Sequence, residues 1–105
     1  MSYRIIIKGS ADADSTAIET YLLEHGVAPE LVLAPIADRI AKDLAKFPNM
    51  HPICQYDNRY RQMVVNSYLV FYHVDEEKSQ VEIHHIWHGM RNIEQLLKEK
   101  GKPAQ

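Results

Sequence analysis

Cysteine, glycine and long apolar runs are scarce in this sequence, and each shortage excludes a type of structure or binding site. A single cysteine, Cys54, excludes an internal disulfide and is typical of proteins of the reducing cytoplasm, where we expect this protein to reside. The four glycines are scattered, so the chain has no glycine-rich loop for cradling phosphates. No apolar run approaches the roughly 18–20 residues that span a bilayer, and we expect no membrane contact.

Basic charge is scarce as well. Twelve Lys and Arg residues against 14 Asp and Glu residues leave a formal net charge of −2. Neutralising phosphates usually needs a basic surplus on some face, so this balance argues against broad nucleic-acid binding.

The opening segment, MSYRIIIKGS, lacks the long apolar stretch of a secretory signal. The length of 105 residues suits one core, and we predict a single domain over 1–105.

A strand and a helix are predicted at the start of the chain. The β-branched segment 3–8 is typical of a short strand. Apolar residues at helical spacing predict a helix over 11–25. Ser10 is expected to cap the start of this helix, and Gly26 to end it in a left-handed conformation.

A second helix is predicted from apolar residues at helical spacing over 33–44. Pro35 leaves two arrangements open, because proline removes a backbone hydrogen bond inside a helix. In the favoured one the helix kinks at Pro35. In the other, a short turn at 29–33 precedes a helix that begins near Ala34. Pro48 and the following asparagine are expected to end the element.

Three strands are predicted in the second half, after an aperiodic loop at 50–58. The alternation of the last strand fails at Ile86, and a β-bulge near His84 and His85 would explain the slip. A short helix follows, and 101–105 are expected to fray. The predicted strands are 59–65, 68–74 and 80–88, joined by a tight turn at Asn66-Ser67 and a polar loop at 75–79.

This order predicts an α+β fold, in which a two-helix hairpin packs on one face of a mainly antiparallel sheet. The strand over 68–74 is apolar on both faces, with Leu69 and Phe71 on one of them. Such a strand lies centrally in a sheet that is covered on both sides. We therefore expect the C-terminal helix or a partner chain to cover the face opposite the hairpin.

Three histidines near the end of the last strand raise the question of a metal site. His84 and His88 would share a face of a regular strand, but about 13 Å apart, which is too far for one ion. No carboxylate or cysteine nearby completes a ligand shell, so we expect no metal and no cofactor.

The same segment offers a proton-transfer group. His88 has the residue type for a general acid or base at neutral pH, and Arg91 is suited to stabilising a developing phosphate charge. Arg59 and Arg61 share a strand face and, with Arg91, would line a groove for phosphates or acidic side chains. The alternative is that His88 caps a sheet edge, that Arg91 pairs with Glu94 or the chain terminus, and that the other arginines are solvated.

Several motifs resemble the RelE/ParE superfamily of bacterial toxin–antitoxin toxins. The resemblance rests on YRIIIKGSADADSTAIETY at the start, LAKFPN after the second helix, and YLVFYHVDEEKSQVEIHHIWHGMRN near the end, and it covers almost the whole chain. It implies a compact α+β toxin: an N-terminal strand, a helix hairpin, a three-stranded meander and a C-terminal helix. It also implies an antitoxin that wraps the toxin and holds it inactive.

The superfamily has two activities. RelE-like members cut mRNA on the ribosome without a metal, and ParE-like members poison DNA gyrase. Arg91 matches the arginine that follows the last strand in ribonuclease members. Leu69 stands where those members commonly carry an arginine, and Leu97 stands near an expected catalytic residue. Together with the net charge, these differences favour the ParE-like activity.

We therefore predict a ParE-like toxin. The alternatives are a metal-independent mRNA endoribonuclease that uses His88, Arg61 and Arg91, with Arg59 as a further phosphate contact, and a non-toxic relative that only binds antitoxin. DNA gyrase or the ribosome with its mRNA is the expected target, and a homodimer or a heterotetramer with antitoxin is the expected assembly. The predicted partner-binding residues are Leu69, Phe71, Ile93, Leu96 and Leu97.

Overall fold

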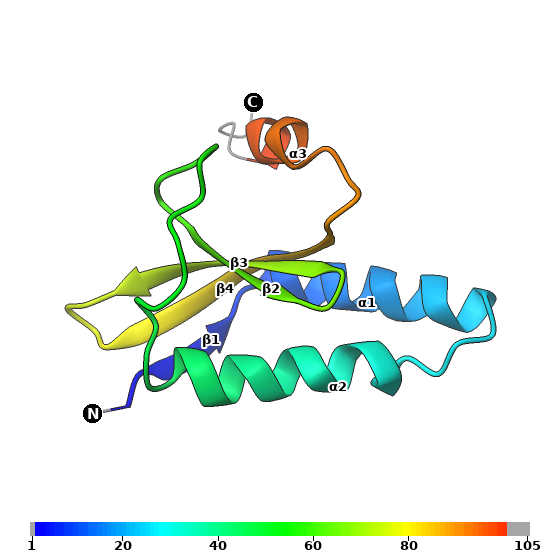
Figure 1. Cartoon of the computed structure of the whole chain (residues 1–105), viewed down its shortest axis with the longest axis horizontal. Helices are drawn as coiled ribbons and strands as arrows, with labels where there is room; N and C mark the ends of the chain where they lie inside the picture. The colour runs from blue at the N-terminus through cyan, green and yellow to red at the C-terminus, as the bar shows by residue number, and fades with distance from the viewer. Residues whose placement is uncertain (1, 101–105) are drawn as a thin grey trace.

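A four-stranded sheet organises the molecule (Figure 1). The computed structural model describes residues 2–100, so the segment expected to fray, 101–105, lies outside the described residues. The strands are β1 (Arg4–Ile7), β2 (Arg61–Val65), β3 (Tyr68–Asp75) and β4 (Gln80–His88). Their order in the sheet is β1-β4-β3-β2, with β1 parallel to β4 and the other pairs antiparallel. The predicted α+β fold is confirmed.

The first helix, α1 (Gly9–Glu24), begins two residues earlier than predicted. Ser10 is therefore inside the helix, and the prediction that it caps the helix is wrong. Its hydroxyl instead donates a hydrogen bond to the carbonyl oxygen of His84, 2.5 Å away on β4. Gly26 follows the helix with φ of 72°, as predicted for a residue that ends a helix in the left-handed region.

The second helix, α2 (Glu30–Arg39), contains Pro35 and continues directly into a π-helical turn, η1 (Ile40–Leu44). Because α2 begins at Glu30, the alternative in which a separate turn precedes a helix from Ala34 is wrong. Asp43 of η1 accepts a hydrogen bond from Nε of Arg39, four residues earlier at the end of α2, at 3.0 Å.

The irregularity predicted in β4 is present. Phe71 of β3 lies opposite His85, whereas the next residue, Tyr72, lies opposite Ile83. His84 therefore has no partner on β3 and is the extra residue of a β-bulge. Beyond the bulge, Ile86 faces the side of the sheet that carries the helix hairpin, and Trp87 faces the other side.

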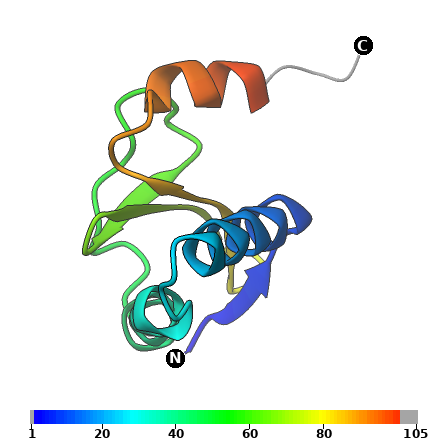
Figure 2. The same ribbon diagram turned by 90° about the vertical axis from the view of Figure 1, so that its right-hand side faces the viewer.

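Both faces of the sheet are covered. The helices α1 and α2 lie on one face, and α3 (Ile93–Lys100) lies on the other (Figure 2). The larger core cluster joins the hairpin to Val70 and Tyr72 of β3, and the smaller one joins α3 and Cys54 to Phe71 and Trp87. The expectation that the C-terminal helix covers the second face is confirmed. Across residues 2–100, no helix combines the length and hydropathy needed to cross a membrane.

Candidate functional site

An open hollow lies between α1 and the end of β4. Its volume is about 500 Å³, and its lining is mostly apolar. Ala17 and Ile18 of α1 form one wall, and Ile86 of β4 belongs to the opposite wall. His88 and Arg91 also line the hollow, so the structure brings these two predicted site residues together.

The imidazole of His88 is held by its own loop. Its Nδ1 accepts a hydrogen bond from the backbone N–H of Met90 at 3.1 Å. The ring also meets the Tyr68 ring edge-on, with 5.2 Å between centroids. When Nδ1 accepts, a neutral imidazole carries its proton on Nε2. His88 therefore presents an N–H donor, whereas a general base acting through Nε2 requires a lone pair there.

Arg91 is exposed at the rim of the hollow. Its guanidinium forms no ion pair within the part of the chain that the structure describes. The nearby Glu94, which offered a partner in the sequence, instead lies 3.6 Å from the ammonium of Lys98. The charge of Arg91 is thus available to a ligand or partner.

Two side chains of α1 hold the bulged strand in place. Asp14 Oδ2 accepts from the backbone N–H of Ile86 at 3.1 Å and lies 3.4 Å from Nδ1 of His85. Ser10 satisfies the carbonyl of His84. Since β1 pairs with β4 only as far as Ile83, these bonds replace the ladder beyond that point. Sequence reasoning missed Asp14. The available signal was its spacing of four residues from Ser10, which places both on one helix face.

Arg61 and Arg59 lie elsewhere. Arg61 is on β2 opposite Tyr72, whereas His88 is opposite Tyr68, so the two are offset by four residues, roughly 13 Å, along the strands. The Arg61 guanidinium donates to the carbonyl of His51 at 2.8 Å. The structure therefore separates Arg61 from His88 and Arg91.

The side chain of Arg59 is paired locally. It lies just before β2, not within the strand as predicted, and bonds Asp57 at 2.6 Å. This pairing raises the pKa of Arg59 and lowers the pKa of Asp57. The groove that we expected Arg59, Arg61 and Arg91 to line together is not formed.

The other two histidines of the segment face the α3 side. His85 stacks on Trp87 with 4.3 Å between centroids, and His84 Nε2 lies 3.2 Å from Glu82 Oε1. Burial lowers the pKa of His84, with Glu82 opposing the shift. Tyr60 packs beside His84 at 5.1 Å, and burial raises the pKa of its hydroxyl. Among residues 2–100, no group of three or more ligating side chains is placed to hold a metal ion.

Similarity to known proteins identifies the family. Residues 5–93 match the family described as the ParE toxin of type II toxin-antitoxin system, parDE. The chain belongs to the ParE toxin family. A solved chain of the toxin–antitoxin complex RelBE2 from Mycobacterium tuberculosis has a similar fold, with a TM-score of 0.64 and 20% identity over 84% of this chain and 92% of that one. Comparison with curated proteins gave no match. The resemblance seen in the sequence is thereby confirmed.

The predicted partner-binding residues of this ParE-family chain form a single cluster. Leu69 and Phe71 of β3 meet α3, where Phe71 is fully buried and Leu97 is 5% exposed. The structure brings these residues together, but in the contact between β3 and α3 of their own chain. The half-buried members are Leu69, Ile93 and Leu96.

A second apolar surface of the ParE-family chain lies between α1 and α2. Two adjoining hollows, of about 470 and 520 Å³, share Leu33 and Ala37 of α2. Exposed apolar side chains flank them, including Ile7 and Leu23. Sequence reasoning made no prediction about a surface between the two helices. The apolar Leu23 was a signal for one, because it lies outside the apolar face of α1.

Proposed function

We propose that this chain is a growth-inhibiting toxin that an antitoxin neutralises, and that its target is DNA gyrase. The support for an antitoxin is the match to the ParE toxin family of type II toxin–antitoxin systems, together with the fold it shares with a chain of a toxin–antitoxin complex. The proposal locates the toxin in the cytoplasm, where it would encounter both gyrase and the antitoxin.

The choice of gyrase over mRNA rests on one observation above the others. The residues that a metal-free ribonuclease would need are not assembled: Arg61 lies two strands from His88 and bonds a loop carbonyl. Cleavage through a ribose 2′-hydroxyl needs a base and charge-stabilising groups around one phosphate, within a few ångströms of each other. The donor tautomer of His88 counts further against a base at this position.

A ribonuclease remains the second candidate because His88 and Arg91 do line one hollow. In that reading Nε2–H of His88 serves as the acid that protonates the leaving oxygen, and Arg91 stabilises the phosphate charge. Leu69 offers no second positive charge on the neighbouring strand. The candidate therefore lacks both a base and a second arginine.

The antitoxin is proposed to contact the α3 side of the sheet. Leu69, Ile93 and Leu96 are half-buried there and are accessible to a partner without rearrangement. Phe71 and Leu97 become accessible only if α3 lifts from the sheet. Hydrogen exchange of the chain with and without antitoxin tests this. Protection is expected to rise across 68–74 and 91–98, and unchanged exchange in both segments would contradict it.

Purified components separate the two targets. The chain is added to a gyrase supercoiling reaction and, separately, to a translation reaction whose mRNA ends are mapped. The proposal expects loss of supercoiling and intact mRNA. The ribonuclease would be established instead by mRNA cleavage that is lost in His88→Ala and in Arg91→Ala, each tested alone. That cleavage would have to persist in Lys78→Gln, which lies in the exposed β3–β4 turn. Inactivity in both reactions, with antitoxin still bound, would identify a non-toxic binding module.

A further inference from the structure

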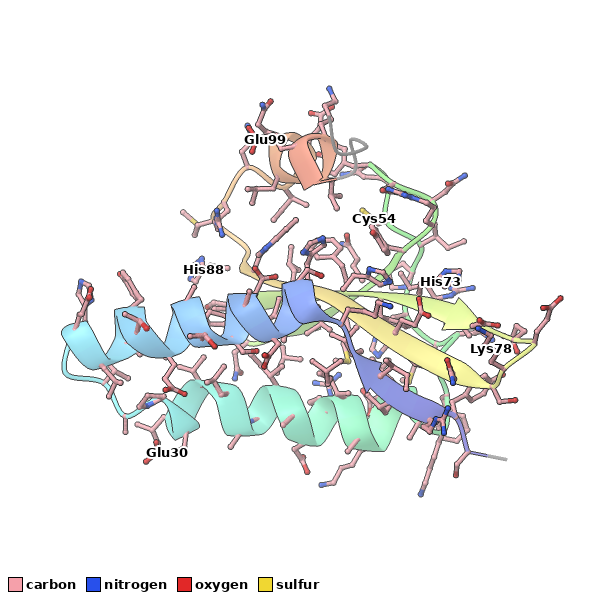
Figure 3. All side chains as sticks on the ribbon, turned by 180° about the vertical axis from the view of Figure 1, so that it is seen from behind. Glu30, Cys54, His73, Lys78, His88 and Glu99 are labelled. Carbon is pink, nitrogen blue, oxygen red and sulfur yellow. The ribbon has the colours of Figure 1, made fainter. Side chains whose placement is uncertain are left out.

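The hollow beside His88 combines apolar walls with hydrogen-bond donors that lack an acceptor among residues 2–100. Ala17, Ile18 and Ile86 supply apolar surface. Arg91 contributes a charge that has no ion-pair partner among the residues the structure describes, and His88 contributes its Nε2–H. Figure 3 shows His88 beside α1, at the opposite end of the molecule from Lys78 in the β3–β4 turn.

The acidic group of the hollow does not neutralise this charge. Asp14 lines the wall, but its Oδ2 is engaged by the Ile86 N–H and lies beside the His85 ring. The rim is therefore left with a guanidinium and a ring N–H that both donate. Two such donors match a carboxylate, because charge-assisted hydrogen bonds from arginine are short and strong.

The apolar walls exclude two simpler occupants. A bare anion would use Arg91 and His88 but leave the surface around Ile18 and Ile86 in water. A purely apolar occupant would cover Arg91 without supplying a partner, which costs free energy because a charge loses its hydration. An occupant that carries both groups side by side satisfies the whole lining.

We infer that this hollow binds a segment of the antitoxin that presents a large apolar side chain next to a carboxylate. The apolar side chain lies against Ala17, Ile18 and Ile86, and the carboxylate accepts from Arg91 and from Nε2–H of His88. The inference rests on the proposed function in that it takes the partner to be an antitoxin. It adds to that function a second contact, between α1 and the end of β4.

A dipeptide probe tests the chemistry without the antitoxin. The full chain, labelled with ¹⁵N, is titrated with N-acetyl-Phe-Glu-amide while amide shifts are followed by NMR. The shifts are expected at Ala17, Ile18 and 88–91. N-acetyl-Phe-Gln-amide, which lacks the charge, and N-acetyl-Ala-Glu-amide, which lacks the apolar side chain, are each expected to bind about tenfold more weakly, since each loses about 1.4 kcal/mol or more. Absence of shifts with the Phe-Glu probe at millimolar concentrations would overturn the inference.

An arginine variant assigns the carboxylate contact. Arg91→Gln is expected to reduce the affinity for the Phe-Glu probe to that for the Phe-Gln probe. Lys98→Gln, which changes an exposed side chain of α3, is expected to keep the tenfold preference for the Phe-Glu probe. Equal binding of both probes by the unaltered chain would overturn the carboxylate assignment. Displacement of the Phe-Glu probe by inorganic phosphate, with no effect of the apolar side chain, would identify a bare anion site. None of these outcomes depends on whether the toxin acts on gyrase.

Discussion

The Asp14 carboxylate accepts a hydrogen bond from the backbone N–H of Ile86 at 3.1 Å and so joins α1 to β4 just beyond the bulge. The contact links residues 72 positions apart in sequence. It lies where β4 has lost its pairing with β1 and before the strand delivers His88 to the hollow. The relation makes α1 a support for the candidate site as well as a wall of it.

Removing this acceptor is expected to destabilise the fold. Asp14→Ala leaves the Ile86 N–H buried without a partner, which costs about 1–3 kcal/mol of the free energy of unfolding. Asp14→Asn keeps one acceptor oxygen and is expected to lose less. Urea unfolding measures both, with Glu19→Ala on the exposed side of α1 as the control. Equal stability of Asp14→Ala and Glu19→Ala would contradict the assigned role.

The half-buried His84 at the bulge predicts a pH dependence. Burial lowers the pKa of His84 below 6.5, so just below that pH the unfolded chain binds more protons than the folded one. This contribution to stability is full above pH 6.5 and is lost as pH falls from there toward the folded pKa. Thermal unfolding between pH 7.5 and 5.5 is expected to show a smaller decline for His84→Gln than for the unaltered chain. The same decline in both, with the exposed His25→Gln as reference, would contradict it.

The attachment of α3 is predicted to depend on Leu97. This side chain is buried against the cluster of Phe71, Trp87 and Cys54, so Leu97→Ala is expected to cost about 2–5 kcal/mol. Trp87 is the single tryptophan, and its fluorescence reports on this cover directly. The emission is expected to shift to longer wavelength in Leu97→Ala. If hydrogen exchange shows that α3 has detached in Leu97→Ala but the emission spectrum is unshifted, residues other than α3 cover Trp87 and the prediction is contradicted.

The loop before β2 is held by a buried tyrosine. The Tyr72 hydroxyl donates to the carbonyl of Pro48 at 2.6 Å, and burial raises the pKa of Tyr72 to about 12. Tyr72→Phe leaves that carbonyl unpaired and is expected to cost about 1–3 kcal/mol. Spectrophotometric titration is also expected to find the pKa of Tyr72 near 12 in the folded chain, well above that of an exposed tyrosine. Ionisation of all tyrosines together near pH 10 would count against the buried hydrogen bond.

The elements were predictable because their signals are local. The failed alternation at Ile86 was enough to predict a bulge near His84 and His85, and the two-sided apolar pattern of β3 was enough to predict a cover for Phe71. Periodicity records which face a side chain takes, and that information is carried by adjacent residues.

The site was harder to predict because it depends on position along and across the sheet. Arg61 and His88 both belong to strands, but the alternation within each strand does not show how the strands are aligned. In the sheet the two residues are offset by four residues along the strand direction. The periodicity of a helix likewise does not show that the side chains of Ser10 and Asp14 form hydrogen bonds with the unpaired backbone edge of β4. Those contacts follow from where β1 stops, which is a property of the folded sheet.

The most direct test of the proposed activity is the order in which syntheses stop when the chain is expressed under tight control. Incorporation of labelled thymidine and of labelled amino acids is followed separately from the moment of induction. Gyrase poisoning predicts an early stop in DNA synthesis while protein synthesis continues. An early stop in protein synthesis with truncated mRNAs would contradict it and would assign His88 and Arg91 to a ribonuclease site.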